Sequence, residues 1–207
     1  MLRIDHVVLA VRDLDAAGTR ILNEVGLGSL PGGRHPGWGT GNRIVPLGHE
    51  YVELLAVLDP IEAESSHVGR WISKVSRSGD RFAAWCVSTD EIEEVAERLG
   101  LAVATGSRSL PDDRTLRWRS VGFDHAAEHP DLPFFISWDG PPELHPGRAQ
   151  AQHRVEPIGI PWIEVAGDYG GLQGWLGGGD VPDRVVGGAP GVRAVGISTD
   201  RGQIVLR

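Results

Sequence analysis

The sequence predicts an α+β protein in which a βαβββ unit is present twice, followed by a shorter third unit. Two segments carry the repeat: HVVLAVRDLDAAGTRILNEVG and FAAWCVSTDEIEEVAERLG share the order of strand, acidic cap, amphipathic helix and closing glycine. The 207 residues also include 29 glycines and 14 prolines, which is typical of short strands joined by tight turns. Because each copy of a repeat is one supersecondary unit, this repeat predicts paired βαβββ modules.

The first unit opens with a strand over residues 3–11. Alternation along this strand places Ile4, His6, Val8 and Ala10 on one face and Asp5, Val7, Leu9 and Val11 on the other. Asp13 is expected to cap a helix that carries an apolar stripe and ends at Gly26, where a closing glycine belongs. Two further strands are predicted over residues 43–47 and 50–57.

The second and third units follow the same logic. A strand from Arg81 leads to a capping box of Ser88 and Glu91, and the helix behind it ends at Gly100. From residue 158 the chain predicts a strand, a weak helix and a hairpin around the turn TDRG. Further strands are expected around residues 101–104, 116–121 and 133–138. We expect modules at 1–75, 76–146 and 155–207 in one globular unit, with a polar, proline-rich connection before the third.

The amino-acid composition and net charge indicate which classes of binding partner the protein can have. The net charge is −8 and the pI is near 5.4, which argues against nucleic acid or an anionic membrane, since both require a basic face. The single cysteine, Cys86, excludes an internal disulfide and fits a reducing compartment. The apolar N-terminal run is broken by Arg12 and Asp13, unlike a signal peptide. We therefore expect a cytoplasmic protein that binds a small molecule.

The segment GGRHPGWGTGNR, residues 32–43, concentrates groups that bind ligands. It lacks the residue order and the lysine of a phosphate-binding P-loop. Arg34 and Arg43 each offer a planar donor fork to an anion, and Trp38 can wall a pocket. We interpret the segment as a substrate-contacting loop that leads into the following strand, with His35 and Asn42 taking part. The alternative is a structural hairpin whose arginines pair with the protein's own acids.

Four quoted motifs carry a family resemblance over residues 3–146. HVVLAVRDLD, RHPGWGTGNR, YVELLAV and LPFFISWDG with HP six residues later resemble the vicinal-oxygen-chelate superfamily, in its glyoxalase-like domain branch. The resemblance implies a curved, open eight-stranded sheet whose concave face often holds a divalent metal. In that superfamily a histidine on the first strand and a glutamate on the fourth supply ligands, and His6 and Glu53 stand at the matching positions.

The predicted strand faces agree that His6 and Glu53 point into the concave side. The matching positions of the second unit are Phe82 and Ser137, which are not metal ligands of the usual kind, and Phe82, Phe135 and Ser137 are expected to line the cup. One divalent ion, Fe, Mn, Zn or Ni, would need a further ligand such as His35, His49, His125, His129 or His145. A metal-free polar pair of His6 and Glu53 is the other interpretation, and the sequence leaves both open.

The resemblance implies an enzyme of lyase, isomerase or dioxygenase type that acts on an oxygenated, anionic compound. In that interpretation Glu53 and His6 act as acid and base or bind the metal, and Arg34, His35, Trp38, Asn42 and Arg43 contact the substrate. The superfamily also includes pure binding proteins, so a non-enzymatic sequestration protein is the alternative. A structural interaction module is a third class, and a homodimer is compatible with the architecture.

Overall fold

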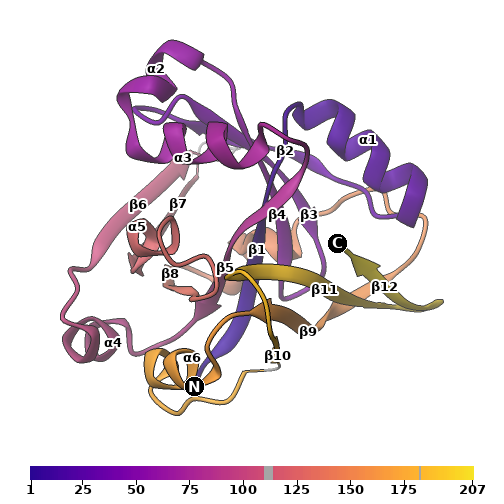
Figure 1. The fold of residues 1–207 in the computed structure, drawn as a ribbon. Coiled ribbons are helices and arrows are strands. Elements are labelled where there is room, and N and C mark those ends of the chain that lie inside the picture. Colours follow the sequence, from indigo (N-terminus) through magenta and orange to yellow (C-terminus); the bar gives the residue numbers. More distant parts are fainter. Residues whose placement is uncertain (110–113, 182) are drawn as a thin grey trace.

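The computed structural model describes residues 1–109, 114–181 and 183–207, and its two sheets are drawn in Figure 1. The first module is a strand, a helix and three further strands. Its elements are β1 (Arg3–Ala10), α1 (Leu14–Val25), β2 (Leu30–His35), β3 (Thr40–Pro46) and β4 (Tyr51–Val57). The second module repeats this order with β5 (Arg81–Ser88), α4 (Ile92–Leu99), β6 (Ala104–Ser109), β7 (Thr115–Val121) and β8 (Phe134–Asp139).

These two modules share one eight-stranded sheet in the order β2-β3-β4-β1-β5-β8-β7-β6. The first strands of the modules, β1 and β5, pair antiparallel at the centre, and each pairs in parallel with the last strand of its own module. The predicted fold class, paired βαβββ modules forming a curved eight-stranded sheet, is confirmed.

Of the four helix-end signals predicted from the sequence for α1 and α4, three are present in the structure. The Asp13 side chain accepts from the Ala16 N–H at 2.9 Å, and Gly26 and Gly100 close α1 and α4 in the left-handed conformation. The predicted capping box of Ser88 and Glu91 is wrong. Instead the Thr89 hydroxyl accepts from the Glu91 N–H at 3.0 Å, so the helix begins one turn later than the motif suggests.

Three short helices in the connections were not predicted: α2 (Pro60–Ser65), α3 (His67–Ser76) and α5 (Phe123–Ala126). Two 3-10 turns, Pro142–Leu144 and Pro146–Arg148, shape the connection to the third unit. In the part of the chain that the structure describes, no helix is both long enough and apolar enough to cross a lipid bilayer.

The elements of the third unit are β9 (Pro157–Ala166), α6 (Tyr169–Leu176), β10 (Asp183–Val186), β11 (Gly191–Thr199) and β12 (Gly202–Leu206). Its strands form their own four-stranded sheet in the order β10-β9-β11-β12. The predicted strand, helix and hairpin are present, and the short strand β10 was not predicted. This strand order differs from that of the first module. There the first strand, β1, pairs in parallel with the last strand, β4, whereas in the third unit the first strand, β9, pairs in parallel with the second strand, β10. The loop after α6 lies against the N-terminal end of the chain at Leu2 (Figure 1).

The two faces of the large sheet belong to different apolar clusters. On the convex face Val7, Val52 and Leu54 pack together with side chains of α1, α4 and the second sheet. On the concave face Val8, Leu55 and neighbouring side chains pack under α3, which fills one end of the cup. Burial on both faces explains why the central strands are apolar almost throughout.

Two β-bulges change the predicted faces of the central strands. On β1 the register shifts between Ile4 and His6, so Asp5 shares the concave side with His6 rather than the convex side with Val7. On β5 the shift occurs opposite Val8 and Leu9, and Phe82 packs into the convex core. The prediction that Phe82 lines the cup is therefore wrong, because an extra residue in a strand reverses the alternation beyond it.

The side chains of strand β8 also point to the opposite faces of the sheet from those predicted. Phe134 stands opposite Cys86 and faces the cup, and Ile136 follows on the same side. Phe135 is fully buried in the convex core, and the Ser137 hydroxyl accepts from Arg119 at 3.4 Å away from the cup. The cup-lining roles predicted for Phe135 and Ser137 are wrong, because a shift of one residue turns every side chain of a strand to the other face.

Candidate functional site

A cavity of about 980 Å³ occupies the concave face of the large sheet. Its walls come from β1, β4, the β2–β3 hairpin, strands β6 to β8 and α5. Of the predicted site residues, it brings together His6, Arg34, His35, Trp38, Asn42 and Glu53. Arg43, Phe82, Phe135 and Ser137 are not among its lining residues.

The segment Gly32–Arg43 is a β-hairpin rather than a loop that leads into a strand. Its residues end β2, turn over 36–39 and begin β3. Because side chains alternate along β3, Asn42 faces the cup and Arg43 faces outward. There the Arg43 guanidinium donates to the Ser29 hydroxyl at 3.0 Å and pairs with Asp15 at 2.8 Å. The substrate-contacting role predicted for Arg43 is therefore wrong.

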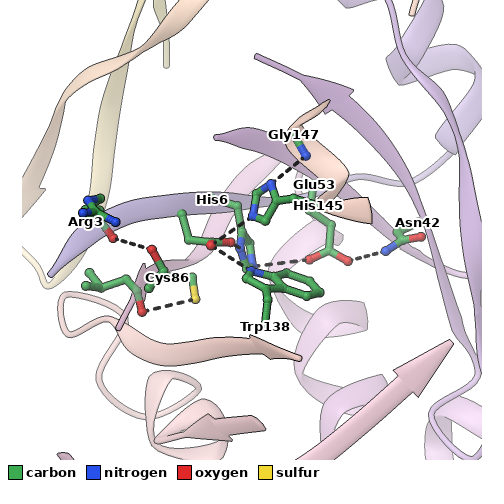
Figure 2. A network of polar contacts seen from close by, with 11 residues as sticks. Arg3, His6, Asn42, Glu53, Cys86, Trp138, His145 and Gly147 are labelled. Carbon is green, nitrogen blue, oxygen red and sulfur yellow. Dashed lines mark hydrogen bonds and ion pairs between the residues drawn. The ribbon is translucent and has the colours of Figure 1, made fainter. Parts of the chain in front are cut away.

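Asn42 fixes the position of Glu53. Its amide Nδ2 donates to Glu53 Oε1 at 2.5 Å, while its Oδ1 accepts from the backbone N–H of Gly33 at 2.7 Å. The amide passes directly over Gly32, where a Cβ would overlap it. Glycine at this position thus lets a β3 side chain bridge from β2 to the carboxylate on β4. The second oxygen of Glu53 stays directed toward His6 (Figure 2).

His6 lies at the floor of the cavity between two carboxylates. Its Nδ1 is 2.6 Å from Asp5 Oδ1, and its Nε2 is 4.0 Å from Glu53 Oε2. The Tyr51 ring stacks on the imidazole with a centroid distance of 4.4 Å, and Phe134 meets it edge-on at 5.3 Å. His6 is only 3% exposed, so the orientation of its ring is set by the protein and not by solvent.

Asp5 is a buried carboxylate that faces three ring nitrogens. Besides His6, Trp138 Nε1 donates to its Oδ2 at 2.9 Å, and His145 Nε2 lies 3.2 Å from the same oxygen (Figure 2). Burial alone would raise the pKa of Asp5. The hydrogen bonds from His145 and His6 outweigh burial and hold that pKa well below its ordinary range.

An ionised Asp5 fixes the roles of the ring atoms around it. Since the carboxylate only accepts, the Nδ1 of His6 carries a proton, and Nε2 is the atom presented to Glu53 and to the cavity. The backbone N–H of Gly147 donates to His145 Nδ1 at 3.1 Å, so His145 carries its proton on Nε2, toward Asp5. The result is a continuous array of Asn42, Glu53, His6, Asp5 and His145.

Two predicted residues lie at the edge of the cavity. Arg34 is 61% exposed and pairs with Glu62 at 3.7 Å, so its charge is largely solvated. His35 Nδ1 is 3.0 Å from the Thr40 hydroxyl, and its ring lies 5.4 Å from that of Trp38. Burial lowers the pKa of His35, which keeps this imidazole neutral near pH 7.

The donors present do not match a resident divalent ion. His6 and Glu53 offer one nitrogen and one oxygen, whereas such sites use at least three protein ligands. Within the described ranges, Asp5, His6 and Cys86 are the group whose potential ligand atoms lie within 4.8 Å of one another. Both Asp5 oxygens are already acceptors, and burial raises the pKa of Cys86 well above its ordinary value, so its thiol stays protonated. Neither set supplies three free ligands.

Several site residues had no role in the sequence analysis. Asp5, Tyr51, Trp138 and Phe134 each touch His6 or its partner carboxylate. The sequence analysis names His145 only as a possible metal ligand. Its place in the proline-rich connection is the one signal in the sequence that could have indicated a role in the site. Nothing in the sequence signals the bulge that turns Asp5 inward, because a bulge depends on the partner strand.

Comparisons with known proteins agree with this architecture. The family model described as "Glyoxalase-like domain" matches residues 4–170. A hypothetical protein from Staphylococcus aureus has a similar structure, with a TM-score of 0.75 and 18% identity over 98% of this chain and 93% of that chain. Methylmalonyl-CoA epimerase from Mycobacterium tuberculosis also matches, with a TM-score of 0.47 and 19% identity over 68% of this chain and 89% of that one. A search of curated proteins found no significant match. The chain belongs to the glyoxalase-like domain family.

Proposed function

We propose that this protein is a small-molecule isomerase or lyase that moves a proton on a carbon next to a carbonyl group. The observation that carries the proposal is the pairing of Glu53 and His6 at the cavity floor, with Oε2 and Nε2 4.0 Å apart and each held from behind. Two groups at this separation can serve neighbouring atoms of one substrate, because each needs only a hydrogen-bond distance to its own atom.

The proton transfers follow from the fixed partners. Glu53 Oε2 removes the proton from carbon while Oε1 stays hydrogen-bonded to Asn42, and the C–H electron pair becomes that of an enolate. His6, in its imidazolium form, donates from Nε2 to the developing enolate oxygen. Asp5 stabilises this imidazolium through the Nδ1–H hydrogen bond. Return of a proton to the other face or a neighbouring atom gives an isomer, and loss of a leaving group gives a lyase product.

The donor set favours this acid–base chemistry over the dioxygenase alternative. Oxygen activation by non-haem iron uses two histidines and one carboxylate around open positions. His6 and Glu53 supply only part of that set, and His6 uses its second nitrogen to bind Asp5. A divalent ion held by His6 and Glu53 and completed by substrate oxygens is the second candidate.

Hydrogen exchange at carbon tests the proposal without a known product. Small 2-oxo acids and hydroxy ketones would be incubated in D2O with the wild-type protein, and loss of the proton next to the carbonyl followed by NMR. We expect enzyme-dependent exchange, and a fall of roughly 100-fold or more in Glu53→Gln, since general bases contribute about 10²–10⁴-fold. Glu94→Gln, on the exposed face of α4, is the matched control and should retain the wild-type rate.

Other outcomes assign the site differently. Calorimetric binding of a carbonyl acid without exchange by the wild-type protein would indicate the sequestration protein and overturn the enzyme. Exchange that disappears after chelation and returns with Mn²⁺ or Fe²⁺ would establish the metal-dependent candidate in place of the metal-independent pair. Equal rates in Glu53→Gln and wild type would remove Glu53 from the role of base.

A further inference from the structure

Aromatic rings run in unbroken contact from the hairpin turn to the catalytic pair. Trp38 stacks on Phe123 at 5.5 Å, and Phe123 meets Phe134 edge-on at 5.1 Å. Phe134 in turn contacts His6, which stacks on Tyr51. Phe134 and Tyr51 are buried, whereas Trp38 and Phe123 are partly exposed toward the cavity. The rings exposed on this side of the cup are therefore those of Trp38 and Phe123, and buried rings connect them to His6.

A second aromatic surface lies on β7 and β8. Trp118 and Trp138 line the same cavity with ring centroids 5.7 Å apart, and both are partly exposed. The Trp118 indole lies against Gly106 of β6, where a Cβ would overlap its ring atoms. Large aromatic side chains that remain partly exposed within a concave site mark a surface that a ligand covers.

The guanidinium group of Arg108 lies in the wall of this cavity. Arg108 on β6 lines it together with Glu53 and His35. Burial lowers the pKa of His35; the negative charge of Glu53 opposes this effect, and the positive charge of Arg108 adds to it. A guanidinium binds a carboxylate through two parallel hydrogen bonds. Since Glu53 is also an anion, a monoanionic ligand suits the cavity better than a dianionic one.

The size of the cavity favours a larger anionic ligand over a small one. Its volume of about 980 Å³ lies at the upper end of the roughly 300–1,000 Å³ that drug-sized ligands occupy. An acid of two or three carbons would leave both aromatic surfaces uncovered. We expect a compound with one ring or two fused rings to contact Trp118 and Trp138 and also His6, since all three residues line this cavity.

We infer that the cup accepts a planar aromatic carboxylate whose ring lies against Trp118 and Trp138 and whose carboxylate pairs with Arg108. The inference rests on the proposed function for the place of the reacting carbonyl, beside Glu53 and His6. It adds the substrate class, and it assigns Arg108 and Trp118 as the residues that determine specificity.

Three matched probes test this substrate class on the wild-type protein by isothermal titration calorimetry. They are 2-naphthoate, the neutral 2-acetylnaphthalene and the saturated decahydro-2-naphthoate. We expect 2-naphthoate to bind about tenfold more tightly than either of the others, because each lacks one interaction worth about 1.4 kcal/mol. A saturated acid that binds as tightly as 2-naphthoate would overturn the aromatic part, and an equally tight neutral ketone would overturn the anionic part.

Variants assign the two interactions to residues. Arg108→Gln should remove the preference for the acid over the neutral ketone, whereas Arg117→Gln, exposed on the opposite face of β7, should not. Trp118→Leu should remove the preference for the aromatic over the saturated acid, and Trp118→Phe should retain it. Unchanged preferences in Arg108→Gln and Trp118→Leu would refute these assignments. Binding of 2-naphthoate does not require turnover, so this inference and the proton-transfer reaction can fail separately.

Discussion

At the scale of single residues, the chemistry of the site depends on one buried carboxylate. Asp5 is 2% exposed, yet its pKa is depressed, since ring N–H groups replace the water it has lost. An ionised group at this position makes Nε2 of His6 the atom that faces the cavity. The same imidazole beside a neutral side chain could adopt either tautomer and would be a poorer acid–base group.

Asp5→Asn should destabilise the fold by about 2–3 kcal/mol at pH 7, because an amide cannot accept from all three ring donors. The folded-state pKa of Asp5 lies below its ordinary value of 3.8, so its ionisation stabilises the protein above that pH. This contribution decreases as pH falls below about 3.8 toward the folded-state pKa. Urea denaturation at pH 7, 5 and 3.5 should therefore show a narrowing gap between variant and wild type at the lowest pH.

Asp90→Asn is the control for this measurement. Asp90 is exposed in the turn before α4, so its substitution should change stability by less than about 0.5 kcal/mol at every pH. A constant gap between Asp5→Asn and wild type from pH 7 to 3.5 would contradict a depressed Asp5 pKa.

At the scale of elements, the β2–β3 hairpin positions the proposed base, Glu53. Its two strands approach closely only where Gly32 stands beneath the Asn42 amide. The hairpin therefore positions Glu53 through the backbone of β2 and a side chain of β3, although Glu53 itself lies on β4. Trp38 and Asn42 of this segment line the cavity, and their contact with a ligand stays a prediction, whereas its arginines pair with Glu62 and Asp15.

Gly32→Ala should lower the unfolding free energy by about 1–3 kcal/mol and reduce carbon proton exchange, because the added methyl group displaces Asn42 from Glu53. Gly33→Ala is the neighbouring control, since a Cβ there meets no atom within 4 Å. Urea denaturation and the exchange rate measure the two effects. Equal stability and equal exchange in both variants would show that the Asn42 bridge is dispensable.

The elements were largely predictable, and the site was predictable in part. Alternating apolar residues and helix caps specify β1, α1 and β4, so His6 and Glu53 were correctly placed on one face. The faces of Asp5 and Phe82 could not be predicted, because each depends on a bulge that forms only in the paired strands. His145 lies 139 residues from His6 in the sequence, and only the folded chain brings it to Asp5.

At the scale of the whole molecule, the second sheet supports the cup from behind. Ile163, Val195 and Ile197 belong to the same apolar cluster as Val7, Trp85 and Leu54 of the large sheet. One continuous core predicts one cooperative unfolding unit, even though the hydrogen-bonded sheets are separate.

Ile197→Ala should therefore destabilise the entire chain by about 2–5 kcal/mol, since it leaves a cavity in the shared core. Unfolding in urea, followed by far-UV circular dichroism and by tryptophan fluorescence, should give coincident transitions in wild type and variant. Val205→Ala, on the edge strand β12 and 40% exposed, should cost less than about 1 kcal/mol. Separate transitions for the two signals would indicate that the sheets unfold independently.

The connection between the sheets sets the minimal length of a working fragment. His145 and Gly147 lie after β8, and the carbonyl of Gly147 accepts from the Gly48 N–H at 2.9 Å, which fastens the connection to the β3–β4 turn. A fragment ending at Asp139 would contain all eight strands of the cup and lack one of the three ring donors to Asp5. The candidate site therefore extends beyond the last strand of the large sheet, and a truncation or domain fusion placed at the end of that strand would remove part of the site.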